Sequence, residues 1–308
     1  MKHERYDLIG DIHGQYGKLE ALLRKMGYAP TGDTWKHAGG RKVIFLGDFV
    51  DRGPQVREVL RTVRGMVEAG DALAIMGNHE YNAVCYHTPD GNGGHLRERS
   101  DRNTRTHQAT LQQFEGRETE WAGWIAWMST LPFALDLGAL RCVHACWDAG
   151  HLETLRGMSL ADSAFLHRSA ARHTAEYAAI ETVLKGPELQ LPDGAVFSDK
   201  EGREHSRIRV KWWGRQAAGS FGEAAMPVPM VELLHIPLAD DACRLANYPA
   251  DAPPVFFGHY WMPADAPKEP LAGNVACLDF GAGLTGPLVG YRWDGEAEVQ
   301  AAKYITHN

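Results

Sequence analysis

Residues 6–14 read Tyr-Asp-Leu-Ile-Gly-Asp-Ile-His-Gly, a short apolar run that stops at a carboxylate and an imidazole. The same arrangement, an apolar run followed by side chains that can bind metals, occurs four more times along the chain. The runs at 43–47, 73–77, 140–143 and 255–258 are followed by Asp48 to Gly53, Asn78 to Glu80, His144, and His259. In an open α/β sheet the carboxyl ends of the strands line the ligand crevice, so we expect these residues to meet at one site.

The apolar runs are continuous rather than alternating, a pattern typical of strands that are buried on both faces. Between the first three runs, residues 15–26 and 54–69 carry apolar side chains at helical spacing. The resulting order of strand, helix, strand, helix and strand predicts an α/β fold. We expect a single domain that spans residues 1–308.

Two segments depart from this order, at about residues 81–130 and 151–209. The first contains Trp121, Trp124 and Trp127 at three-residue spacing, which predicts a helix whose aromatic side chains pack on the body of the protein. The second segment also contains a helix-like stretch. Because both lie between core strands, we predict helical insertions that cover one face of the domain.

Composition and charge narrow the choice of function. A net charge of −7 and a pI near 6.1 argue against a broad basic surface that would hold nucleic acid by its phosphates. The N-terminal segment lacks the apolar core of a signal peptide, and no run approaches the roughly 20 apolar residues of a membrane span. We therefore predict a cytoplasmic protein with no membrane partner. Its five cysteines are scattered and are predicted to be reduced thiols: Cys85, Cys142, Cys146, Cys243 and Cys277.

The side chains at the strand ends are carboxylates, imidazoles and an amide, which together form a mixed oxygen and nitrogen donor set. Such a set suits Mn²⁺, Fe or Zn²⁺ and differs from a structural zinc site made of thiolates alone. A carboxylate such as Asp48 can bridge two ions, and two ions roughly 3.5–4 Å apart clamp a phosphoryl group and lower the pKa of a bound water. Each motif alone is also typical of a capped strand end, a turn or a core histidine. Five motifs in order favour a metal site.

The motifs Gly10 to Gln15, Gly47 to Gly53 and Gly77 to Glu80, followed by His144 and Gly258-His259, resemble the calcineurin-like metallophosphoesterase superfamily. The chain is most similar to its phosphoprotein phosphatase branch, which includes Ser/Thr protein phosphatases and symmetrical diadenosine tetraphosphatases. The resemblance implies a two-sheet β sandwich flanked by helices, in an α/β/β/α arrangement, and two divalent metal ions. We expect Mn²⁺ first, with Fe, Zn²⁺, Ni²⁺, Co²⁺ or Mg²⁺ as alternatives.

The resemblance also implies how the ligands divide between the two ions. Asp48 would bridge them. Asp11 and His13 would complete the first site, whereas Asn78, His144 and His259 would complete the second.

Further residues would assist the reaction without binding metal. His79 would protonate the leaving oxygen as the general acid, and Asp51 would orient its imidazole. Arg52 would bind the phosphoryl oxygens through its planar guanidinium group. The branch also has a second arginine near a Trp-Gly pair, and we predict Arg215 for this role, with Arg207, Arg209 and Lys211 as alternatives. Six other histidines are expected in solvent or in the insertions, without a metal role: His87, His95, His107, His167, His173 and His205.

The function implied by the resemblance is hydrolysis of a phosphate ester or anhydride by direct attack of a metal-bridging hydroxide, without a phosphoenzyme. The expected substrates are a phosphorylated protein or a dinucleoside polyphosphate. Nucleic-acid ends and cyclic nucleotides are the alternative phosphodiester substrates, and nucleic acid suits this acidic chain less well. A catalytically silent metal-binding scaffold is the alternative from another class. It would be expected to have lost some of the residues that this sequence retains: Asp48, Arg52, Asn78 and His79.

Overall fold

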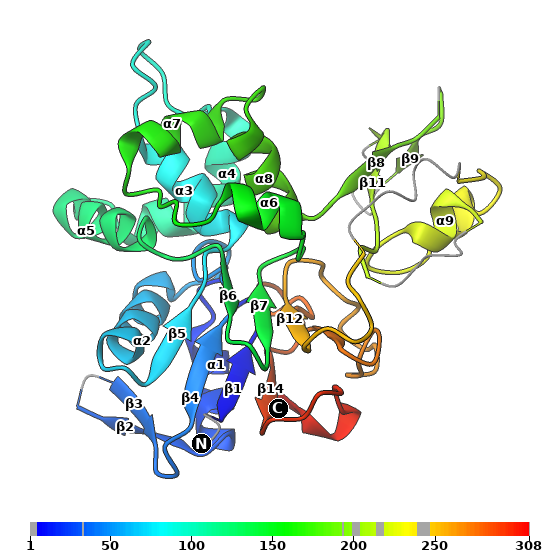
Figure 1. Cartoon of the computed structure of the whole chain (residues 1–308). Helices are drawn as coiled ribbons and strands as arrows, with labels where there is room; N and C mark the ends of the chain where they lie inside the picture. The colour runs from blue at the N-terminus through cyan, green and yellow to red at the C-terminus, as the bar shows by residue number, and fades with distance from the viewer. Residues whose placement is uncertain are drawn as a thin grey trace.

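Two β-sheets that pack on one another form the centre of the molecule (Figure 1). The structure is a computed structural model and describes residues 5–32, 34–192, 194–198, 204–213, 219–238 and 247–307. The first sheet has the strand order β15-β14-β1-β4-β5, and the second has the order β13-β12-β7-β6. The bounds in the first sheet are β1 (Tyr6–Ile9), β4 (Lys42–Phe45), β5 (Ala72–Ala74), β14 (Val289–Trp293) and β15 (Tyr304–Thr306). Those in the second are β6 (Ala134–Asp136), β7 (Arg141–Val143), β12 (Val255–Phe257) and β13 (Val275–Cys277).

The strands that precede the predicted site residues run parallel within each sheet. In the first sheet β4 pairs in parallel with both β1 and β5, and in the second β12 pairs in parallel with β7 and β13. Strand β14 is antiparallel to β1, and β6 is antiparallel to β7. Parallel pairing brings the carboxyl ends of β1, β4 and β5 to one edge of their sheet, and likewise those of β7 and β12.

Successive residues of each strand face different cores, which explains why the apolar runs are continuous. Leu8 and Phe256 lie in the core between the two sheets, whereas their neighbours Ile9 and Phe257 lie in the larger core under the helices. A strand buried on both faces carries mostly apolar residues at successive positions, and the buried Asp7 of β1 is paired with Arg41 and Arg292. The expectation of a two-sheet sandwich flanked by helices is therefore confirmed.

Helices α1 (Tyr16–Lys25) and α2 (Val56–Glu68) lie beside the first sheet, and they agree with the helices predicted at 15–26 and 54–69 except at their ends (Figure 1). Both place an apolar stripe in the core, and α2 buries Val59, Leu60 and Val63. A hairpin of β2 (Tyr28–Thr31) and β3 (Thr34–His37) follows α1.

The two predicted insertions supply six helices that lie together on one side of the sheets (Figure 1). Trp121 and Trp124 are buried in the core, and Trp127 packs against it, as their spacing predicts. The helices of the first insertion are α3 (Asn78–His87), α4 (Asp101–Gln113) and α5 (Glu118–Met128). Those of the second are α6 (Ala149–Thr154), α7 (Ser163–Ala170) and α8 (Ala175–Lys185).

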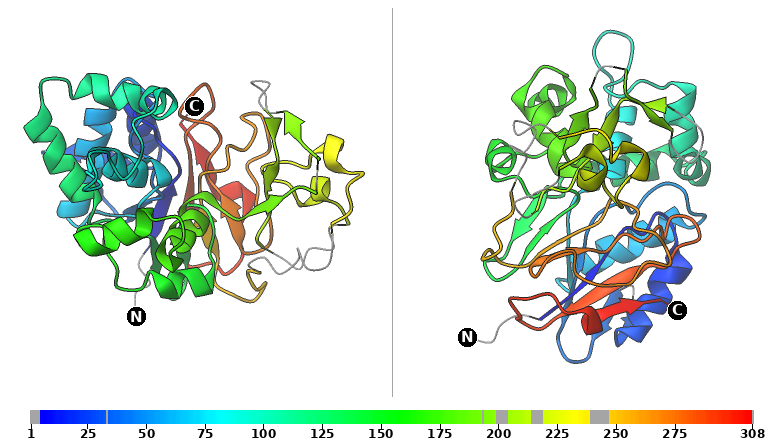
Figure 2. Two further views of the ribbon diagram at one scale, coloured as in Figure 1. Left: turned by 90° about the horizontal axis from the view of Figure 1, so that it is seen from above. Right: turned by 90° about the vertical axis from the view of Figure 1, so that its right-hand side faces the viewer.

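The chain after α8 forms a small lobe beside the second sheet, which Figure 2 shows from two further directions. Its apolar side chains form a separate cluster that includes Leu191, Ile208 and Phe221. The elements of the lobe are β8 (Glu188–Gln190), β9 (Phe197–Ser198), β10 (Glu204–His205), β11 (Arg207–Arg209), α9 (Phe221–Ala224) and η1 (Val231–Leu233). A last short helix, η3 (Ala301–Lys303), precedes β15.

Two general predictions concern the whole chain. Four cysteines within the described ranges are buried and unpaired, namely Cys85, Cys142, Cys146 and Cys277, whereas Cys243 lies outside those ranges. In the part of the chain that the structure describes, no helix has the length and apolar character needed to cross a membrane.

Candidate metal centre

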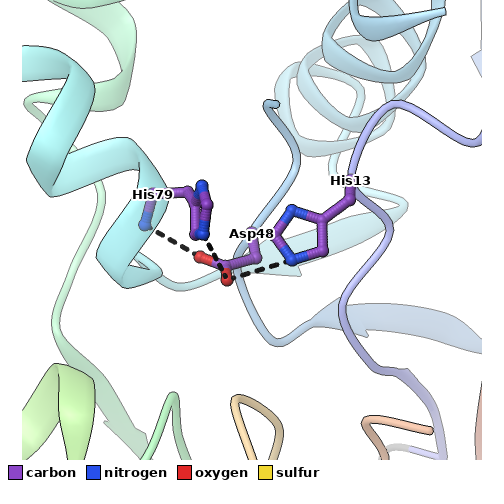
Figure 3. Close-up of side chains that lie close together, drawn as sticks. All are labelled: His13, Asp48 and His79. Carbon is purple, nitrogen blue, oxygen red and sulfur yellow. Dashed lines mark hydrogen bonds and ion pairs between the residues drawn. The ribbon is translucent and has the colours of Figure 1, made fainter. Parts of the chain in front are cut away.

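Asp48, which follows β4, lies at the centre of the predicted ligands. Each oxygen of its carboxylate faces a histidine: Oδ2 is 3.4 Å from His13 Nε2, and Oδ1 is 3.4 Å from His144 Nε2 (Figure 3 shows Asp48 with His13 and His79). Two donor groups with ligand atoms within 4.8 Å of one another share this carboxylate: His13, Asp48 and His79, and Asp11, Asp48 and His144. A side chain shared by two groups is what a bridging ligand requires.

The other predicted ligands close the site. Asn78 Oδ1 lies 2.9 Å from His144 Nε2 and 2.8 Å from His259 Nδ1, and Asp11 Oδ2 accepts a hydrogen bond from the His259 backbone N–H at 3.0 Å. All six predicted ligands are buried. They come from five strand ends, and the structure brings them together in one place.

The donor atoms fit a cation better than they fit one another. Asp11 Oδ1 and His13 Nε2 are buried and have no hydrogen-bond partner among the described residues, and the same holds for His259 Nε2. A buried polar atom without a partner costs about 1–3 kcal/mol. A divalent ion would supply the missing partner, and two ligand atoms about 2.1 Å from a shared tetrahedral ion lie about 3.4 Å apart. This separation equals that between Asp48 and each of its histidines.

The histidines are held in the tautomer that a metal ligand needs. His13 Nδ1 donates to the carbonyl of Val50 at 2.9 Å, and His144 Nδ1 donates to the carbonyl of Leu46 at 2.8 Å, so both Nε2 atoms point at Asp48. Such a second hydrogen bond is the usual way in which proteins orient a ligating imidazole. Burial, together with the neighbouring His79, lowers the pKa of His13 to about 3. Burial also opposes charge on His144, but Asp48 raises the pKa of His144 to about 10, a sign of how strongly the carboxylates attract positive charge.

The backbone of the site is strained. Six residues other than glycine have positive φ in the described ranges, and five of them are predicted site residues: His13 (48°), Asp48 (54°), Asp51 (70°), Arg52 (65°) and His259 (70°), with Trp261 (52°) as the sixth. Side chains with a Cβ atom disfavour this region, and such residues gather at functional sites.

Two glycines allow the ligands to approach the backbone. A Cβ atom on Gly258 would lie 1.9 Å from Asp11 Oδ1, and one on Gly77 would lie 2.3 Å from Asp48 Oδ1. Neither position can carry a larger residue unless a ligand moves. This explains the glycine at the end of these apolar runs.

Glu80, which has no assigned role in the sequence motif, supports the Asp48 turn. Its carboxylate accepts hydrogen bonds from the backbone N–H groups of Gly77 (3.0 Å), Asp48 (2.7 Å), Phe49 (2.8 Å) and Val50 (3.3 Å). Burial and the charge of Asp48 raise the pKa of Glu80 to about 7. A partial signal for this role was present, because Glu80 is the third residue of α3, where a glutamate side chain can accept from the backbone N–H of the residue before the helix, here Gly77.

His79 and Asp51 form a close pair beside the ligands. His79 Nδ1 donates to Asp51 Oδ2 at 2.6 Å, whereas His79 Nε2 lies 4.0 Å from Asp48 Oδ2. Burial opposes charge on His79, but Asp48 and the hydrogen bond to Asp51 raise the pKa of His79. One nitrogen of the ring is thus occupied, and the other faces the site.

Arg52 lies on the far side of His79 from Asp51. Its Nη2 is 3.5 Å from His79 Nε2, and its guanidinium group lies 4.0 Å from the ring centre of Trp261. The Trp261 backbone N–H in turn donates to Asp279 Oδ2 at 2.8 Å. The buried carboxylate of Asp279, like that of Glu80, has no role in the sequence-based assignment.

The predicted second arginine, Arg215, lies outside the described residues. Among its alternatives, Arg207 donates to Gln190 Oε1, and Lys211 Nζ donates to the carbonyl of Glu223. Arg209 is exposed, and its Nε lies 4.0 Å from Glu188 Oε1. Burial and then the positive charge of Arg209 lower the pKa of His259.

A polar groove of about 670 Å³ lies beside Arg52. Arg102 and Arg105 of α4 also line it, and no carboxylate is present among the described residues of its wall. On a chain with a net charge of −7, this groove is a local region of positive charge.

Comparison with known proteins agrees with this geometry. The family model of the calcineurin-like phosphoesterases matches residues 5–159, about half of the chain, which includes five of the six predicted ligands but not His259. The chain is 45% identical over 74 residues to proteins of Anoxybacillus flavithermus and Bacillus subtilis, each named "Bis(5'-nucleosyl)-tetraphosphatase PrpE [asymmetrical]". These matches cover 24% of this chain and 30% of each relative.

A solved structure with a similar fold is a protein serine/threonine phosphatase from Saccharomyces cerevisiae. The similarity covers 99% of this chain and 79% of that one, with a TM-score of 0.50 and 14% identity. At this identity the likeness concerns the fold alone. With the family match, the ordered motifs and the observed sandwich in agreement, the chain belongs to the calcineurin-like phosphoesterase family.

Proposed function

We propose that this protein hydrolyses a phosphate ester or anhydride with two divalent metal ions held by Asp11, His13, Asp48, Asn78, His144 and His259. The observation that carries the proposal is the carboxylate of Asp48, shared by two buried donor groups in which atoms of Asp11 and His13 have no other described partner. Members of this family depend on divalent metals. When bound, two such ions supply Lewis acidity and make a water molecule acidic enough to attack phosphorus at neutral pH.

The side chains around the ligands would guide the reaction. His79 would donate a proton from Nε2 to the leaving oxygen, because its Nδ1 is occupied by Asp51. Arg52 would bind the phosphoryl oxygens. Asp51 would keep the imidazole of His79 charged and correctly oriented. No serine or cysteine nucleophile is required.

Metal content and activity test this proposal together. The protein as purified, after dialysis against a chelator, and after addition of Mn²⁺ would be compared by metal analysis and by turnover of p-nitrophenyl phosphate. We expect chelation to abolish turnover and Mn²⁺ to restore it, with Fe, Zn²⁺, Ni²⁺, Co²⁺ and Mg²⁺ compared in parallel. A protein that binds no metal and has no activity would instead be the silent scaffold.

The absence of a phosphoenzyme can be tested separately. Hydrolysis in ¹⁸O-labelled water under single-turnover conditions should place the label in the phosphoryl product. A phosphorylated side chain trapped during turnover would overturn direct attack by water.

We propose a dinucleoside polyphosphate as the substrate class. The groove beside Arg52, with Arg102 and Arg105 in its wall, offers positive charge for phosphates beyond the one that is attacked, and two relatives over part of the chain are named as tetraphosphatases. A panel of diadenosine tetraphosphate, phosphoseryl and phosphothreonyl peptides, and bis-p-nitrophenyl phosphate tests this choice. Higher kcat/KM on the phosphopeptides would make the protein a protein phosphatase. Preference for the diester would make it a phosphodiesterase.

A further inference from the structure

The carboxylate of Asp51 makes more contacts than its pairing with His79 requires. While Oδ2 accepts from His79, Oδ1 accepts from His107 Nδ1 at 2.7 Å and from the hydroxyl of Thr110 at 2.7 Å. The backbone N–H of Asp51 donates to the same hydroxyl at 2.9 Å. Since the hydroxyl of Thr110 accepts this bond, its own proton is directed to Oδ1. All four residues are buried.

His107 cannot turn away from Asp51. Its ring lies against Tyr86 at 5.3 Å and Trp121 at 5.8 Å between centres, and its Nε2 is 3.2 Å from His87 Nε2. Nδ1 donates to the carboxylate, and Nε2 shares a hydrogen bond with His87 Nε2. Burial, together with His107, lowers the pKa of His87 to about 4.

Both contacts come from one helix of the first insertion. His107 and Thr110 are three residues apart on α4, so they project from the same face of the helix toward Asp51. They lie 56 and 59 residues from Asp51 in sequence. In addition to covering the domain, α4 therefore contacts a predicted site residue, Asp51.

We propose that α4 positions the general acid: His107 and Thr110 fix the carboxylate of Asp51, and Asp51 in turn fixes His79. This inference rests on the proposed function, because it concerns the acid of that reaction. Two donors on Oδ1 stop the carboxylate from rotating and leave Oδ2 directed at the imidazole. Loss of either donor should let Asp51 turn, so that the Nε2 atom of His79 no longer meets the leaving oxygen.

Paired variants separate positioning from simple packing. His107→Leu removes the donor, whereas His107→Asn places an amide N–H where Nδ1 lies. Thr110→Val removes the hydroxyl at constant shape, and Thr110→Ser retains it. Phe114→Leu is the matched control, because Phe114 is buried at the end of α4 and packs against Trp121 in a tilted arrangement.

Each variant would be loaded with Mn²⁺ and assayed on phenyl phosphate, whose leaving group needs a proton, and on p-nitrophenyl phosphate, whose leaving group does not. We expect His107→Leu and Thr110→Val to lower kcat on phenyl phosphate by about 10- to 100-fold, in line with losses at residues that orient catalytic groups. The loss on p-nitrophenyl phosphate should be much smaller, and metal content and KM should not change. His107→Asn and Thr110→Ser should recover most of the activity, and His107→Leu should have no further effect when added to Asp51→Asn.

A measurement without turnover accompanies the kinetics. In ¹⁵N-labelled protein, the Nδ1–H proton of His79 should resonate far downfield in the wild type and in His107→Asn, and should shift or broaden in His107→Leu. Equal losses on both substrates, absence of rescue by His107→Asn, or additive effects with Asp51→Asn would each overturn the positioning role. A wild-type protein that turns over neither substrate would refute the proposed function itself, whereas an unchanged His79 resonance in His107→Leu refutes only the role of α4.

Discussion

A single substitution at His79 distinguishes two chemical roles for this residue, metal ligand and general acid. The structure places its Nε2 near His13 and Asp48, as a ligand would be placed (Figure 3). Its Nδ1, however, donates to Asp51, as a general acid would require. His79→Asn is the informative change. The asparagine amide can occupy the position of Nδ1 and retain a hydrogen bond to Asp51, while nothing replaces Nε2.

The expected size of the effect follows from what Nε2 does. If Nε2 carries the proton to the leaving oxygen, its loss should lower kcat by about 10²–10⁴, equivalent to about 3–5 kcal/mol of transition-state stabilisation. The metal content should stay at the wild-type value, because the six ligands remain. The 4.0 Å between His79 Nε2 and Asp48 Oδ2 exceeds the 3.4 Å that separates each of His13 and His144 from the same carboxylate.

The assay combines metal analysis of the dialysed variant with kcat on phenyl phosphate and p-nitrophenyl phosphate. His173→Asn, the same change at an exposed position, controls for general effects of the substitution. Loss of about one ion per chain, with activity that returns at high Mn²⁺, would show that His79 is a ligand and that the assignment of the acid is wrong.

Three further predictions concern other parts of the structure. Gly258→Ala should weaken Mn²⁺ binding by about 10- to 100-fold in a metal titration, because its new Cβ atom would lie 1.9 Å from Asp11 Oδ1 and displace that ligand. Arg41→Ala should lower the free energy of unfolding in urea by about 3 kcal/mol, because it leaves the fully buried Asp7 without one of its two arginine partners. His87→Gln should reduce the loss of stability at acid pH. The pKa of His87 is about 4 in the folded protein and 6.5 when unperturbed; the unfolded state therefore binds the proton first, and stability should fall as the pH drops from 6.5 through 4, as measured by the Tm at each pH.

Each of these predictions has a matched control. Gly273→Ala should leave metal binding unchanged, because no atom lies within 4 Å of its Cβ position. Arg156→Ala removes an exposed ion pair with Glu153 and should change stability by less than about 0.5 kcal/mol. His173→Gln should leave the acid branch of the Tm curve as in the wild type. If a control variant showed the same change as its test variant, the explanation given for that test variant would be contradicted.

The clustering of the candidate ligands could be predicted because its signal is local. Each predicted ligand follows an apolar run directly, and parallel pairing then brings the ends of the runs together without any knowledge of loop structure. The second sheet could not be worked out in this way. A run that is buried on both faces, such as the one that contains Leu8 and Ile9, carries no alternation that would show which residue faces the other sheet.

The supporting residues divide according to how far away their partners lie. Glu80 and the Asp48 turn are joined through the start of a helix, so a capping pattern could have indicated the contact. His107 reaches Asp51 from 56 residues away, on a polar helix where no local pattern separates it from His87 or His95. Similarly, several basic residues precede Arg215, and no local pattern shows which of them lies near the site.

The positive φ angles at five site residues lower the stability of the fold, although their side chains are the ones that the proposed function needs. If each costs about 1–3 kcal/mol, together they cost about as much as the 5–15 kcal/mol of net stability that a typical domain has. Glycine at His13 or Asp48 would adopt the same backbone without this cost but would remove a ligand. Selection for stability alone would therefore tend to replace these candidate metal ligands.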